Sequence, residues 1–183
     1  MDIHTLFNST PEFNKRLLAA LVDLDMLEQC LGLEMDHICI RLDTDSSVQL
    51  MHRELLAVGT NISTAMVHGR LIHLIKLNKP LQIGPWSVGC VELPYPHPDK
   101  PYVNGWEHVE FVLLSQANTM EALQDSFDEM FPRLSSEHMS ARHERRDSLP
   151  NAEGDQLPNP TIALTKDDVG IKFHPLSIQE VVA

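Results

Sequence analysis

The chain has 183 residues, enough for one ordinary domain or for two small modules that share a hydrophobic core. Hydrophobic residues make up 43% and charged residues 22%, a balance typical of a globular protein and not of a disordered one. The net charge is −12, from 14 basic and 26 acidic residues, and this argues against nucleic acid or an anionic membrane as the main partner, because both bind positive surfaces.

Cysteine usage and hydropathy indicate the compartment. The chain has an odd number of cysteines, namely Cys30, Cys39 and Cys90, and none belongs to a C-x-x-C pair. The sequence therefore predicts neither a disulfide framework nor a zinc ribbon. No apolar run approaches the ~18–20 residues needed to cross a bilayer, and the N-terminal stretch lacks the apolar core of a signal peptide. We therefore expect a cytoplasmic protein with no membrane partner.

Residues 1–34 predict an N-terminal helical extension. Apolar residues between Leu6 and Leu27 recur mostly on one helical face. Ser9-Thr10-Pro11-Glu12 is a helix start signal and Gly32 a stop signal. This portion has no counterpart later in the sequence, so we expect it to cover one face of a sheet.

Residues 35–95 predict a first module with the order strand, helix, strand, strand, strand. The predicted elements are a strand at 37–42, a helix at 48–58, hairpin strands at 61–67 and 71–77, and a strand at 88–93. The proline-rich residues 96–104 follow as an expected linker, because proline removes the N–H donors that a sheet needs.

Residues 105–183 predict a second module in the same order. The predicted elements are a strand at 106–114, a helix at 119–131, and strands at 161–164 and 169–173. Residues 137–160 should supply the missing hairpin strand, although their glycine, proline and asparagine content favours loop over much of this stretch.

The two modules also resemble each other in sequence. Asp36-His37-Ile38-Cys39-Ile40-Arg41-Leu42 is echoed by Glu107-His108-Val109-Glu110-Phe111-Val112-Leu113, and Val88-Gly89-Cys90-Val91-Glu92-Leu93-Pro94 by Val169-Gly170-Ile171-Lys172-Phe173-His174-Pro175. Two echoes in the same order indicate a duplicated unit. The predicted fold is α+β: two paired βαβββ modules in one structural domain, forming a curved mixed sheet around a groove.

Alternation along a strand separates an apolar face from a polar one. In the first strand the polar face carries His37, Cys39 and Arg41, and in the echoing strand it carries His108 and Glu110. The apolar faces are needed for packing against helices. The polar faces are not, yet both begin with histidine at equivalent positions.

A common groove between the modules would bring the two histidines together with an acid. His37, His108 and Glu92 could then hold a divalent metal ion in a two-histidine, one-carboxylate arrangement that leaves positions open for substrate. Nickel, zinc, manganese and ferrous iron all accept such ligands. Glu110 is a competing carboxylate or a hydrogen-bond partner of a ligand, and His73 is a further candidate for the groove.

The repeat, with histidine on the opening strands and Glu92 on the closing strand of the first module, resembles the vicinal oxygen chelate superfamily over about residues 36–175. That superfamily includes glyoxalases and extradiol dioxygenases. The whole chain resembles the YecM-like bacterial family of that fold. The resemblance implies metal ligands on the first and fourth strands of each module. His37, Glu92 and His108 match this pattern, Phe173 in the fourth position does not, and His174 beside it could replace the missing ligand.

The leading functional interpretation is a divalent-metal-dependent isomerase, lyase or oxygenase that acts on a small polar metabolite. Glu110 is then the candidate general base and Arg41 the candidate anchor for an anionic substrate group. The alternative is a non-catalytic protein that holds a small ligand in the same groove, which Phe173 in the ligand position favours.

Overall fold

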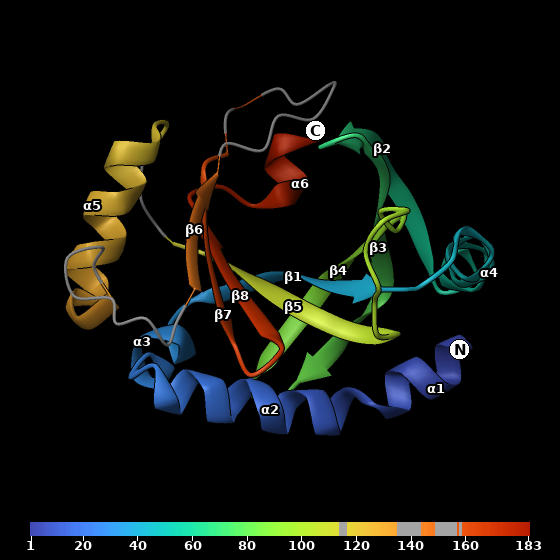
Figure 1. Ribbon diagram of the computed structural model, residues 1–183, viewed down its shortest axis with the longest axis horizontal. Helices are drawn as coiled ribbons and strands as arrows, with labels where there is room; N and C mark the ends of the chain where they lie inside the picture. The colour runs from blue at the N-terminus through green and yellow to red at the C-terminus, as the bar shows by residue number, and fades with distance from the viewer. Residues whose placement is uncertain (114–116, 135–143, 149–156, 158) are drawn as a thin grey trace.

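The structure is a computed structural model that describes residues 1–113, 117–134, 144–148, 157 and 159–183. Within these residues one curved eight-stranded sheet runs through the molecule in the order β2-β3-β4-β1-β5-β8-β7-β6 (Figure 1). The strands are β1 Glu34–Arg41, β2 Gly59–Val67, β3 Arg70–Ile83, β4 Trp86–Pro94, β5 Gly105–Val112, β6 Glu144–Ser148, β7 Thr161–Lys166 and β8 Val169–His174. The helices are α1 Ile3–Asn8, α2 Thr10–Asp23, α3 Leu27–Leu31, α4 Asp45–Leu56, α5 Met120–Met130 and α6 Ile178–Val181, with a 3₁₀ turn at Pro132–Leu134.

The strand order repeats in the two halves of the sheet. Strands β2-β3-β4-β1 form one half and β6-β7-β8-β5 the other, with β1 parallel to β4 and β5 parallel to β8. The two halves meet at the antiparallel pair β1–β5. Helices α4 and α5 flank the sheet on opposite sides (Figure 1). This arrangement confirms the predicted α+β fold of two paired βαβββ units.

Local sequence signals explain where several elements begin and turn. Thr44 and Thr119 occupy the N-cap positions of α4 and α5, where each hydroxyl accepts a hydrogen bond from a backbone N–H of the first turn. The β2–β3 hairpin turns at His68 and Gly69, both of which have positive φ (49° and 77°). Such a two-residue turn matches the twist of the strands that it joins.

The missing hairpin strand of the second half is β6, which pairs antiparallel with β7. It lies inside the predicted interval 137–160, most of which falls outside the described residues. In the described ranges none of the helices is long and apolar enough to span a membrane.

The N-terminal extension forms three short helices that complete the core. Leu6, Phe13 and Leu17 are almost fully buried and join the same hydrophobic cluster as the sheet. Two tryptophans tie the extension to the strands. The Trp106 indole donates to the Leu6 carbonyl at 3.1 Å, and the Trp86 indole donates to the Cys30 carbonyl at 3.0 Å. Helix α2 runs past the turns that join β3 to β4 and β7 to β8 (Figure 1).

The two faces of the central strands differ as the alternation predicts. Ile38, Ile40, Val109 and Phe111 are completely buried in the hydrophobic core. The other face carries histidines and glutamates, and it lines a cavity together with Ile178 of helix α6. The candidate site therefore lies at the centre of the sheet, where the two halves meet.

Candidate metal centre

The strand registers bring two histidines and two glutamates onto one face. In the β1–β5 pair His37 lies opposite Glu110, and Cys39 lies opposite His108. In the β1–β4 pair Cys39 lies opposite Glu92. Cys39 is thus flanked by Glu92 on one side and His108 on the other. We refer to His37, Glu92, His108 and Glu110 as the ligand cluster.

The donor atoms of the ligand cluster converge. His37 Nε2 lies 3.6 Å from Glu92 Oε2 and 3.3 Å from Glu110 Oε1. His108 Nε2 lies 3.3 Å and 3.1 Å from the same two oxygens. Because metal–nitrogen and metal–oxygen bonds to a zinc-like ion are about 2.0–2.2 Å long, neighbouring ligands of one ion are separated by roughly 3.0–3.5 Å. The histidine–glutamate spacings and the donor types therefore suit a divalent metal ion.

Three compact donor groups lie here within the described residues, and two of them overlap at Glu92. His37, Glu92 and Glu110 offer ligand atoms that all lie within 4.8 Å of one another, and so do Cys39, Glu92 and His108. Glu92 belongs to both groups. The predicted ligands His37 and His108 thus fall into different groups and share Glu92 as a neighbour, with Glu110 and the buried Cys39 thiol beside them.

Each histidine is oriented by the acid that precedes it in the sequence. Asp36 Oδ2 lies 2.8 Å from His37 Nδ1, and Glu107 Oε2 lies 2.8 Å from His108 Nδ1. A carboxylate at Nδ1 fixes the Nδ1–H tautomer and leaves Nε2 directed at the cluster. This carboxylate–histidine pairing is the usual support of a metal-bound imidazole.

Two β-bulges make these neighbouring side chains meet. Adjacent residues of a regular strand point to opposite faces, so an acid would not reach the histidine that follows it. The β1–β5 register shifts between Met35 and His37, where Asp36 is the extra residue, and again opposite Ile40, where Glu107 is the extra residue. A bulge re-aims the local side chains. The two bulges occupy equivalent positions in the two modules.

The electrostatics of the cluster are strongly coupled. Burial would raise the pKa of Glu92, but hydrogen bonds from His108 and His37 outweigh it and hold that pKa well below its usual range. Burial would lower the pKa of His37, but Glu110 and Asp36 outweigh it and hold that pKa well above its usual value. These shifts favour ionised glutamates and a positively charged His37 imidazolium.

The position equivalent to Glu92 is occupied by Lys172, and the expectation that Phe173 stands there is wrong. Glu92 lies opposite Cys39 in β1–β4, and Lys172 lies opposite Glu110 in β5–β8. Aligning the two Val-Gly dipeptides matches Gly89 with Gly170, whereas the strand registers make Cys90 the equivalent of Gly170. This shift of one residue exchanges the two faces of the strand. Phe173 is fully buried on the core face.

Aromatic contacts in the core explain why Phe173 is buried. Its ring stacks on Phe111 at 5.6 Å between centroids and contacts Phe127 and Phe131, each at 5.3 Å. Lys172, by contrast, reaches the cluster, where its Nζ lies 2.7 Å from Glu110 Oε1. The fourth strand of the second module therefore contributes an ammonium group in place of a ligand.

Gly170 provides the space that His108 occupies. It lies opposite His108 in the β5–β8 register, where a Cβ on Gly170 would stand 2.6 Å from the His108 Cβ. Real Cβ atoms do not approach so closely. Around Gly89, the glycine of the other Val-Gly dipeptide, no described atom lies within 4 Å of such a Cβ, apart from its own chain neighbours.

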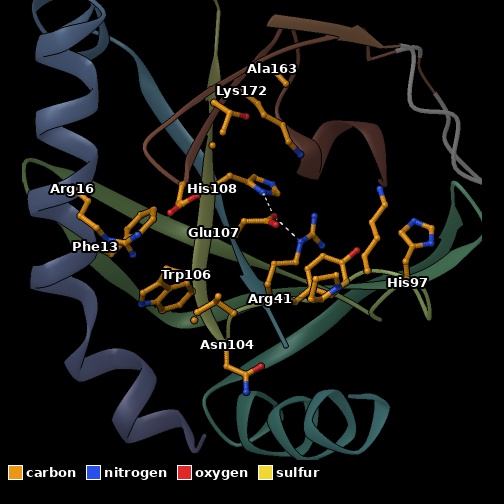
Figure 2. Close-up of a pocket in the computed structure, with 18 of the residues that line it drawn as sticks. Phe13, Arg16, Arg41, His97, Asn104, Trp106, Glu107, His108, Ala163 and Lys172 are labelled. Carbon is orange, nitrogen blue, oxygen red and sulfur yellow. Dashed lines mark hydrogen bonds and ion pairs between the residues drawn. The ribbon is translucent and has the colours of Figure 1, made fainter. Parts of the chain in front are cut away.

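Arg41 lies where the sequence predicts it, on the groove side of β1. Its Nε forms an ion pair of 2.6 Å with Glu107 Oε2, and its guanidinium lies 5.8 Å from the centroid of the Tyr102 ring. Figure 2 shows Glu107 between His108 and Arg41, joined to both. Glu107 thus connects a candidate ligand with the candidate anion anchor.

The two remaining histidine candidates lie in different surroundings. His174 is completely buried beside the cluster, with Nε2 at 3.6 Å from Asp36 and 3.7 Å from Glu110, and together with Asp36 and His37 it forms a third compact donor group. His73 stacks on His52 of helix α4 at 3.9 Å between centroids. Its strand neighbours, and not His73 itself, line the cavity beside the cluster, so the suggestion that His73 faces the groove is wrong.

Two cavities open beside the cluster. A smaller one of about 340 Å³ is lined by His37, Glu92 and Glu110. A larger one of about 940 Å³ contains His108 and Glu107, and Figure 2 shows Lys172 and Arg41 among its lining residues. Arg41 and Lys172 line both. Residues of the ligand cluster thus line both cavities.

Sequence reasoning missed three supporting features of the site: the acids Asp36 and Glu107, the space at Gly170, and the ammonium of Lys172. The acids were visible as a repeated acid–histidine dipeptide. The role of that dipeptide depends on bulges, which the sequence did not indicate.

The paired βαβββ fold is of the vicinal oxygen chelate type. The chain matches the family described as YecM protein over residues 2–183, and it belongs to this family. It is 37% identical over 166 residues to Protein YecM of Escherichia coli (strain K12), a match that covers 87% of this chain and 85% of the relative.

Two further proteins are similar to this chain over most of its length. An uncharacterized protein of Haemophilus influenzae is 32% identical over 153 residues, which covers 80% of this chain and 77% of that protein. The solved structure of the structural-genomics protein EC4020 superposes with a TM-score of 0.76 at 32% identity, covering 98% of this chain and 91% of that one.

Proposed function

We propose that this protein is a divalent-metal-dependent enzyme of the vicinal oxygen chelate type, with isomerase, lyase or oxygenase activity on a small polar metabolite. The observation that carries the proposal is the convergence of two carboxylate-oriented imidazoles on two glutamates beside a cavity. His37 Nε2 and His108 Nε2 approach the same two oxygens at 3.1–3.6 Å.

The ligand cluster supplies the residues that would hold the ion. His37, His108 and Glu92 are assigned as ligands, and nickel, zinc, manganese and ferrous iron all suit nitrogen and carboxylate donors. A bound divalent ion would act as a Lewis acid on adjacent substrate oxygens. Asp36 and Glu107 keep the two imidazoles in the tautomer that ligation requires.

Glu110 is better suited to binding the ion than to removing a proton. Burial would raise the pKa of Glu110, but the charges of Lys172 and His37 outweigh it and hold that pKa well below its usual range. An efficient general base has a pKa near the working pH. Glu110 therefore remains ionised, which favours a fourth-ligand role over the general-base role.

Arg41 is assigned to an anionic group of the substrate. It is 8% exposed, it lines both cavities, and its planar guanidinium matches a carboxylate. Through Glu107 its position is coupled to that of His108. A substrate group on Arg41 would thus be held at a fixed position relative to the cluster.

The second candidate function is a non-catalytic small-ligand-binding protein. One observation favours it: Lys172 Nζ lies 2.7 Å from Glu110 Oε1, so the cluster already contains a cation that neutralises one glutamate. A cavity arranged in this way can hold a ligand without any metal. The two functions differ in whether the protein requires a metal ion.

The test is the metal content of untagged protein, measured by elemental mass spectrometry before and after incubation with nickel, manganese, zinc or anaerobic ferrous iron. We expect near-stoichiometric metal in the wild type and its loss in His37→Ala/His108→Ala. A His4→Ala/His97→Ala variant removes two histidines outside the cluster and should retain the metal. Wild-type protein that holds none of these metals would refute the metalloenzyme and leave the binding protein.

A further inference from the structure

The smaller cavity concentrates positive charge in an acidic protein. The chain as a whole has a net charge of −12, yet Arg41, Arg70 and Lys172 all line this cavity. Its carboxylates are Glu92 and Glu110, the two glutamates of the ligand cluster. A charged, partly enclosed cavity with apolar walls focuses the electric field on a bound ion.

Two arginine nitrogens at this cavity are left without partners. Arg41 Nη1 and Arg70 Nε are buried and make no hydrogen bond to any residue that the structure describes. Glu107 engages Arg41 only through Nε. A buried donor without a partner is costly, and most such donors in folded proteins are satisfied. Both guanidinium groups therefore have unused donors, which an anion in the cavity could reach once the arginine side chains turn toward it.

The charge balance favours more than one negative charge on that ligand. A divalent ion in the cluster would balance Glu92 and Glu110, and Glu107 balances Arg41, which leaves Arg70 and Lys172 as the uncompensated cations of the cavity. Lys172, which now pairs with Glu110, would share that glutamate with the ion. A monoanion would neutralise only part of this charge.

Between the ligand cluster and the two arginines, the walls of the cavity are apolar and suit a short hydrocarbon chain in the ligand. The cavity is about 340 Å³, at the small end of the range for ligand sites, and Val67, Ile72 and Leu74 are among its lining residues. Arg41 lies four residues beyond His37 on the same strand, so roughly 13 Å separates their Cα atoms. The long arginine side chain covers part of this distance.

We propose that the cavity binds a short-chain 2-oxo or 2-hydroxy dicarboxylate. The end with adjacent oxygens faces the ligand cluster, and the distal carboxylate binds Arg41 and Arg70. The proposal deepens the proposed function and rests on it for the placement of the first end. The distal carboxylate depends only on residues of this chain.

The test compares 2-oxoglutarate with 2-oxopentanoate by isothermal titration calorimetry. The two acids have the same chain length and the same 2-oxo acid group, and they differ only in the distal carboxylate. Each is titrated into metal-free protein and into manganese-loaded protein from which free metal has been removed. We expect the loaded wild type to bind 2-oxoglutarate more tightly by about tenfold or more, since hydrogen bonds to charged groups are the strong ones.

Variants show which residues cause the preference for 2-oxoglutarate over 2-oxopentanoate. Arg70→Gln should remove most of it, and Arg41→Lys, which keeps the charge but loses the planar fork, should weaken it. Lys79→Gln is the matched control, because Lys79 is an exposed cation on the same strand as Arg70 and does not line either cavity. Thermal unfolding of each variant verifies that it is folded.

The outcomes separate the two proposals. Equal affinity for the two acids, no binding of either, or a preference that survives Arg70→Gln would overturn the dicarboxylate assignment even if manganese binds. Failure of the protein to bind metal, together with an Arg70-dependent preference for 2-oxoglutarate in the metal-free protein, would refute the metalloenzyme and support the dicarboxylate site.

Discussion

Replacement of Gly170 by alanine tests whether the strand register has been assigned correctly around His108. A Cβ at this position would stand 2.6 Å from the His108 Cβ, whereas carbon atoms in favourable contact lie about 3.5–4.0 Å apart. Roughly 1 Å must be accommodated between two strands that are hydrogen-bonded to each other. Neither atom belongs to a flexible side-chain end, so the backbone or the His108 ring must move.

Gly89→Ala is the matched control. Both glycines lie in strands and follow a valine, and alanine in a strand gains about 0.5–1 kcal/mol over glycine. Both variants share this gain. The difference between their free energies of unfolding therefore measures the cost of the close contact between the new Cβ and His108, about 1–3 kcal/mol. We expect Gly89→Ala to be at least as stable as wild type and Gly170→Ala to be less stable than Gly89→Ala by that amount.

Urea unfolding measures the free energies, and calorimetric titration with manganese measures the effect on the cluster. Displacement of His108 should weaken metal binding by about 10–100-fold in Gly170→Ala, the range for losing the support of a ligand, and leave Gly89→Ala unchanged. If the two variants are equally stable and bind metal equally well, the proximity of Gly170 and His108 is refuted.

Three further predictions concern the residues around the cluster. Asp36→Asn should weaken metal binding by about 10–100-fold in a calorimetric titration, because Asp36 orients His37 and also accepts hydrogen bonds from Ser177 Oγ and the Ile178 N–H; unchanged affinity would remove Asp36 from the site. Phe173→Ala should cost about 3–5 kcal/mol of unfolding free energy, because this ring is fully buried, whereas a residue lining the groove would cost little. Metal affinity should rise with pH between about pH 6 and pH 8, because the pKa of His37 is raised and a bound ion must displace its proton. Affinity independent of pH in that window would show that this imidazole is not a ligand.

The sequence was sufficient for the fold because the fold depends on repeated, local patterns. Alternation separated Ile38 and Ile40 from His37, and the echo of the Asp36-His37 stretch at Glu107-His108 located the pseudo-symmetric central strands. Both patterns are strong because each histidine strand must bury one complete face.

The register of the last strand could not be obtained in this way. Valine and glycine recur at both copies, but similarity of two residues does not fix pairing, and a slip of one residue exchanged Phe173 and Lys172. The bulges at Asp36 and Glu107 were equally hidden, because an extra residue in one strand is defined only by its partner strand.

The central claim is that one metal ion binds between the two halves of the sheet. The most direct measurement is anomalous X-ray diffraction from crystals of the untagged protein soaked in manganese or zinc. We predict one strong peak about 2.0–2.3 Å from His37 Nε2, His108 Nε2 and a Glu92 oxygen, with Glu110 as the fourth ligand. A cluster without a peak after soaking, with Lys172 still paired to Glu110, would contradict the claim.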